Sequence, residues 1–72
     1  MSHYHINVFY SDEDGAWVAD IPDLQYCSAF GATAEGAVAE VEKAQELWLE
    51  VARDSGKPIP EARYRPAISQ SR

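Results

Sequence analysis

Residues 3–31 read HYHINVFYSDEDGAWVADIPDLQYCSAFG, and three short runs in this stretch have the residue pattern of β-strands. In residues 3–10, successive side chains alternate between a wetter face and a more apolar face, as they do along a strand. Gly15 follows a charged cluster and supplies the positive φ that a tight reversal needs. Residues 16–21 and 26–30 form the second and third runs. The stretch therefore predicts a three-stranded antiparallel meander.

An amphipathic helix is predicted after the third strand. Thr33 is a suitable N-cap, and Gly56 is suited to end the helix in a left-handed conformation. One helix face, expected to cover the sheet, gathers Ala34, Ala37, Val38, Val41, Ala44, Gln45, Trp48, Val51 and Ala52. A short fourth strand is expected around residues 63–68, where Pro66 would confine it to a sheet edge. The expected fold class is α+β, with one helix packed on one face of the sheet.

The charge is negative and unevenly distributed. The chain of 72 residues has net charge −6, the wrong sign for a module that binds nucleic acid by neutralising phosphates. Residues 1–42 contain eight acidic residues and no Lys or Arg. A surface formed by these acidic residues can attract a basic protein, or it can serve only to keep the protein soluble. The composition leaves both interpretations open. The expected charged contacts of a partner are Asp12, Glu13, Asp14, Asp20 and Asp23.

Catalytic and metal-binding patterns are weak in this sequence. The carboxylates that could converge on a metal ion are Asp20, Asp23, Glu35 and Glu40, and nothing in their spacing requires convergence. His3 and His5 share a strand face but have no third ligand of matching geometry, and Cys27 has no partner cysteine. We therefore expect no metal, no cofactor and no catalytic residue. A single cysteine, with neither a signal peptide nor a membrane span, predicts a cytoplasmic protein.

Self-association is expected, because one helix covers only one face of the sheet. The second face carries His3, His5 and Phe9, and Leu47 and Leu49 fall at the rim of the helix stripe. These five residues are the candidate contacts of a dimer or tetramer.

A longer pattern spans nearly the whole chain before the tail. The run DEDGAWVADIPDL at residues 12–24, followed by Cys27, Gly31, Thr33, Glu35 and Ala37, resembles the HicB-like antitoxin family. The similarity continues through Ala44, Glu46, LWLE at residues 47–50 and KPIPE at residues 57–61. Two positions depart from the family pattern: Tyr26 stands where glycine is common, and Gly36 where glutamate is common.

The resemblance implies a reduced ribonuclease H-like fold, β-β-β-α-β, that binds and masks a small basic mRNA-cleaving toxin of the HicA type without catalysis. It implies a HicB-like domain in residues 1–61 and a C-terminal tail in residues 62–72, without the DNA-binding domain of two-domain members. Two alternatives stay open: a residual metal-dependent RNA-processing enzyme of ribonuclease H-like ancestry, and a stand-alone scaffold or ligand-binding domain with no toxin.

Overall fold

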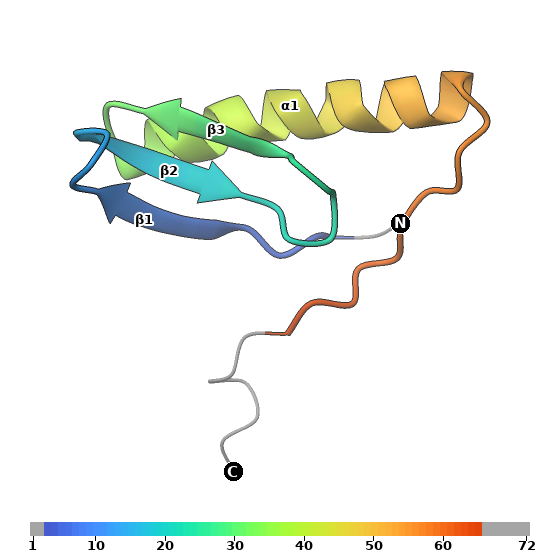
Figure 1. Cartoon of the computed structure of the whole chain (residues 1–72), viewed down its shortest axis with the longest axis horizontal. Coiled ribbons are helices and arrows are strands. Elements are labelled where there is room, and N and C mark those ends of the chain that lie inside the picture. Colours follow the sequence, from blue (N-terminus) through green and yellow to red (C-terminus); the bar gives the residue numbers. More distant parts are fainter. Residues whose placement is uncertain (1–2, 66–72) are drawn as a thin grey trace, which may run out of the picture.

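The computed structural model describes residues 3–65 and contains a three-stranded sheet and one helix. The strands are β1 (Asn7–Ser11), β2 (Ala16–Asp20) and β3 (Ser28–Gly31), followed by α1 (Ala34–Asp54). Both strand pairs are antiparallel, in the order β1-β2-β3, and α1 runs along the sheet on the side of β3 (Figure 1). The predicted meander and the α+β class are confirmed.

The turn between β1 and β2 is the predicted reversal. Gly15 has a φ of 63°, and its N–H donates to the carbonyl of Ser11 at 2.8 Å. Ser11 is opposite Ala16 in the register, so the ladder begins immediately at the turn.

Two strands start later than the alternation pattern predicts. The first strand begins at Asn7, not at residue 3, because the ladder ends at the pair of Asn7 and Asp20. Two residues further on, His5 would be opposite Pro22, which has no N–H to donate. The third begins at Ser28, not at residue 26, because Tyr26 has a φ of 63° and belongs to a turn. Hydrophobic alternation indicates which residues suit a strand but does not show where a partner is present.

The core lies between the sheet and α1. Its buried members are Ala19, Ile21, Leu24, Cys27, Ala37 and Val41. β3 and α1 approach closely at Gly31, where an added Cβ would lie 2.3 Å from the backbone N of Ala37. Only glycine permits this approach, which brings Ala37 into full burial.

The helix boundaries agree closely with the predicted caps. The hydroxyl of Thr33 accepts the N–H of Gly36 at 2.9 Å, and Gly56 beyond the last turn has a φ of 74°. The predicted apolar stripe is wrong at Val51, which is 56% exposed because it lies beyond β3 at the edge of the sheet. Leu49, expected at the rim, packs against the core instead.

The segment after α1 returns toward the start of the chain (Figure 1). Residues 61–65 have no regular secondary structure, so the expected fourth strand is absent from residues 63–65. Its remaining residues, 66–68, lie outside the described part of the chain.

Candidate partner-binding surface

The face of the sheet opposite α1 carries an apolar row. Ala19 and Ala29 point toward the core, so their neighbours along β2 and β3 point to the other face. Phe9, Val18 and Phe30 are in register on this open face, one from each strand. Phe9 is 49% exposed and Phe30 57% exposed. The row is large enough to contribute to a protein contact but needs polar neighbours for specificity.

Three of the predicted acidic contacts lie together on the turn between β1 and β2. Asp12, Glu13 and Asp14 are all exposed. The carboxylate of Asp14 accepts a hydrogen bond from the hydroxyl of Ser11 at 3.0 Å, and its N–H donates to the same hydroxyl at 3.2 Å. Asp14 therefore holds the shape of the turn, and Asp12 and Glu13 are free to contact a partner.

Asp20 lies at the other end of β2 from the acidic turn. It is half-buried and occupies the open face, in register with Asn7 and Ser28. Its charge acts on the neighbouring thiol: burial first, and Asp20 second, raise the pKa of Cys27. The apolar row thus lies between an acidic turn and a single acidic residue.

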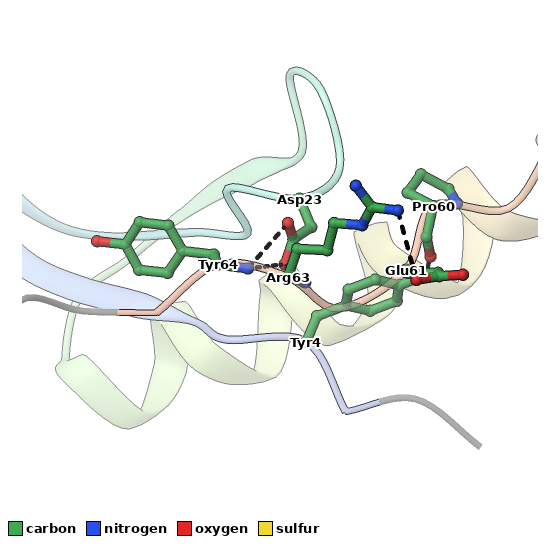
Figure 2. Close-up of polar contacts among 6 residues, drawn as sticks. All are labelled: Tyr4, Asp23, Pro60, Glu61, Arg63 and Tyr64. Carbon is green, nitrogen blue, oxygen red and sulfur yellow. Dashed lines mark hydrogen bonds and ion pairs between the residues drawn. The ribbon is translucent and has the colours of Figure 1, made fainter. Parts of the chain in front are cut away.

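Asp23 binds the chain's own C-terminal segment. Figure 2 shows its carboxylate facing the backbone of residues 63 and 64. The N–H of Arg63 donates to Oδ2 at 3.1 Å, and the N–H of Tyr64 donates to both oxygens at 3.1 and 3.2 Å. Tyr4 adds a second link, because its hydroxyl donates to the carbonyl of Pro60. Asp23 is therefore already engaged, unlike the acidic residues of the turn.

The chain's own cations do not neutralise the acidic turn within residues 3–65. The ion pairs of this part of the chain join Lys43 to Glu40 at 3.4 Å and Arg63 to Glu61 at 3.6 Å. Both pairs are exposed, and neither includes one of the five predicted contacts. The carboxylates of the turn are therefore exposed to solvent, and none of them is paired with a cation of residues 3–65.

The residues expected to mediate self-association are distributed over separate surfaces. Phe9 lies on the open face of the sheet, Leu47 is exposed on α1, and Leu49 is half-buried. His5 Nε2 donates to Asn7 Oδ1 at 2.8 Å, and its ring lies 4.8 Å from that of Tyr64. His3, which is exposed, lines a small polar pocket together with Glu42 and Glu46 on α1.

Other chemistry is sparse in the described part of the chain. Within residues 3–65, no three His, Cys, Asp or Glu side chains come together as a metal site. No helix of this part is both long enough and apolar enough to cross a membrane. Cys27 is unpaired and buried, as its apolar neighbourhood predicts.

Two features of the structure were not predicted from the sequence. The binding of residues 60–64 by Asp23 and Tyr4 joins positions far apart in the chain, and no local pattern indicates it. The second is a groove beside β3 into which Leu47 and Val51 project. These two residues are four apart and therefore lie on the same flank of the helix, so their spacing could have indicated this groove.

Comparisons with known proteins identify relatives. Residues 4–71 match the model of a family described as the HicB-like antitoxin of bacterial toxin–antitoxin systems. The UPF0150 protein ssl0259 of Synechocystis is 38% identical over 53 residues, which cover 74% of this chain and 73% of that protein. No solved structure matches.

Proposed function

Because this chain belongs to the HicB-like antitoxin family, we propose that it binds and masks a small basic toxin of the HicA type, without catalysis of its own. Family membership supports a role in a toxin–antitoxin system and a non-catalytic one. The proposal places the protein in the cytoplasm, where the mRNA substrates of such a toxin are found.

The observation that carries the masking mechanism is the cation-free acidic turn next to the apolar row. Asp12 and Glu13 have no basic partner within residues 3–65, and Phe9 and Phe30 expose apolar surface on the adjoining face. A toxin that binds RNA presents a cationic surface, and an acidic surface with an apolar centre complements it. Occupying that surface excludes the RNA.

The roles of the five acidic residues differ in this proposal. Asp12 and Glu13 steer and contact the toxin, and Asp14 keeps the turn in shape. Asp20 contacts the toxin at the far end of the open face. Asp23 can contact it only by releasing the N–H groups of Arg63 and Tyr64.

The first experiment recovers the partner from the native host with the tagged full-length chain. A small basic protein recovered in equal amount, whose cleavage of mRNA stops when this chain is added, supports the proposal. A chain that recovers no such protein, or leaves its cleavage unchanged, contradicts it.

The second experiment tests the acidic turn with matched charge reversals. Asp12→Lys with Glu13→Lys is compared with Glu46→Lys and Glu50→Lys, which change the net charge equally but lie on α1. We expect the turn variant to bind the toxin roughly tenfold more weakly, mainly through slower association, and to lose salt dependence. Equal weakening by the helix variant would show that only net charge matters.

The metal-dependent RNA-processing alternative is tested separately. Cleavage of RNA by the purified chain with Mg²⁺ or Mn²⁺, lost in Asp20→Asn, would favour it over the antitoxin role. The described residues bring no carboxylate cluster together for such chemistry.

A further inference from the structure

The segment that follows α1 is held by side chains from much earlier in the sequence. Residues 60–64, the strap, have no regular secondary structure and contribute no side chain to the core. The hydroxyl of Tyr4 donates to the carbonyl of Pro60, and the carboxylate of Asp23 accepts two consecutive N–H groups of the strap at 3.1 and 3.2 Å. Figure 2 shows these contacts together. Hydrogen bonds, and not burial, therefore hold the strap in place.

The strap lies on the side of the open face, at the end of the sheet where Asp20 lies. Asn7 is in register with Asp20 on that face. His5 Nε2 is hydrogen-bonded to Asn7 Oδ1 at 2.8 Å, and the ring of Tyr64 lies 4.8 Å from the His5 ring. A partner that covers the open face as far as Asp20 would therefore meet the strap.

The carboxylate of Asp23 keeps its negative charge although the strap covers it. Backbone N–H groups are neutral, and the cations of this segment are directed elsewhere. Arg63 Nη2 lies 3.6 Å from Glu61 Oε1, and Arg65 Nη1 donates to the carbonyl of Tyr64 at 3.0 Å. A guanidinium group binds a carboxylate through two charge-assisted hydrogen bonds, each roughly twice as strong as a bond from a neutral donor. A basic side chain from a partner can therefore replace the strap at Asp23.

We infer that the strap occupies, in the free chain, the binding site for a basic segment of the toxin, and that the toxin displaces the strap to reach Asp23. This inference rests on the proposed antitoxin function. The apparent affinity for the toxin is reduced to the fraction of chains in which the strap is open. Exposed hydrogen bonds of this number favour the closed strap on the order of tenfold. The strap therefore weakens toxin binding by roughly the same factor, and it excludes proteins that have no basic group to replace it.

Two substitutions release the strap without changing the net charge. Tyr64→Pro removes the N–H that reaches both oxygens of the carboxylate, and Tyr4→Phe removes the hydroxyl that binds Pro60. Calorimetric titration with the toxin recovered from the native host should show roughly tenfold tighter binding for Tyr64→Pro and a smaller gain for Tyr4→Phe. Ala62→Pro, which leaves both bonded N–H groups in place, and Tyr10→Phe, which removes a hydroxyl from β1, are the matched controls and should bind as the parent does.

A second substitution tests whether the toxin takes over Asp23. In the Tyr64→Pro chain, where the strap is already released, Asp23→Asn should weaken toxin binding roughly tenfold, because the carboxylate then contacts the toxin directly. Glu50→Gln in the same chain removes an equal charge from α1 and should change binding by less than about twofold. If Asp23 served only to hold the strap, its replacement would have no effect once the strap is released.

Hydrogen exchange followed by NMR reports on the strap itself. In the free parent chain, the amide of Arg63 should exchange roughly tenfold more slowly than in Tyr64→Pro, since it donates to Asp23 in the closed strap. Addition of the toxin to the parent chain should raise this exchange to the rate in the variant. Slower exchange in the complex would show that the toxin closes the strap, which contradicts the inference.

Failure of this inference is distinguishable from failure of the proposed function. A parent chain that binds and inhibits the toxin, while Tyr64→Pro and Tyr4→Phe bind it no more tightly, overturns the inference and leaves the antitoxin role standing. Asp23→Asn without effect in the released chain overturns it equally, because the toxin then does not use this carboxylate. A parent chain that binds no basic protein overturns both.

Discussion

Replacing Gly31 with alanine tests whether the close approach of β3 to α1 holds the domain together. The added Cβ would lie 2.3 Å from the backbone N of Ala37 and 2.8 Å from its Cα. Carbon atoms pack best at about 3.5–4.0 Å, so strand and helix would have to separate by roughly 1 Å. Backbone atoms cannot rotate out of the way, as the end of a flexible side chain can.

The loss of stability caused by this separation can be estimated from the packing contacts that are lost between β3 and α1. A gap of about 1 Å forfeits up to about half of the attraction between the facing atoms, and overpacking a core costs about 1–3 kcal/mol. We expect Gly31→Ala to lower the free energy of unfolding by about 3 kcal/mol, since Ala37 and Val41 are fully buried against the sheet. For a domain of this size the melting temperature would fall by roughly 10–20 °C.

Thermal and urea unfolding, followed by circular dichroism and tryptophan fluorescence, measure this change. Gly36→Ala is the matched control, because a Cβ there meets only the Thr33 hydroxyl at 3.1 Å. Alanine at that helical position should leave the stability unchanged or raise it by up to about 1 kcal/mol. If Gly31→Ala unfolds within about 0.5 kcal/mol of the parent, the argument from close approach is wrong.

Three further predictions concern the tail, the core and the thiol. Asp23→Ala should raise hydrogen exchange and proteolytic cleavage in residues 60–65 while global stability falls by only about 1 kcal/mol, because the lost hydrogen bonds are exposed; unchanged exchange would contradict the anchoring role. Val41→Ala should cost about 1.5–3 kcal/mol in urea unfolding, since the side chain is fully buried; a loss below about 0.5 kcal/mol would show that the site collapses. Burial, and then Asp20, raise the pKa of Cys27, so the folded state holds this proton more tightly than the unfolded state. The free energy of unfolding should therefore fall as the pH rises through the alkaline range in which an unfolded cysteine ionises, and this dependence should shrink in Cys27→Val.

Local patterns were reliable wherever the chain decides its structure over a few residues. The reversal at Gly15, the cap at Thr33 and the termination at Gly56 all form as their residue types predict. The alternation of side chains along β1 was also predicted correctly, because alternation is a property of the strand itself. Its assignment to a polar and an apolar face was not, because Phe9 adds apolar surface to the first while Val8 and Tyr10 are exposed on the second. Each of these features depends on neighbours within about four residues in the chain.

Features that depend on distant neighbours were predicted poorly. Val51 suits the apolar stripe of α1, but it lies past the edge of the sheet, and a helical pattern contains no information on the width of the sheet. Tyrosine is a residue type that is common in strands, yet the turn from Leu24 to Cys27 places Tyr26 at positive φ. The tail segment at residues 60–64 is anchored by Tyr4 and Asp23, contacts that only folding brings together.

The candidate partner-binding surface also combines features set by the local sequence with features set by contacts between distant residues. The sequence by itself determined the family, the meander, the helix and the cation-free acidic half of the chain, because motif order, alternation and charge are written along the chain. Only the tertiary structure decided that the turn acids at residues 12–14 lack a cation within the described residues while Asp23 is engaged by the backbone of the tail. It alone placed Tyr26, Leu47 and Val51 around one groove, because their meeting depends on how the helix crosses the strands and not on their order in the chain.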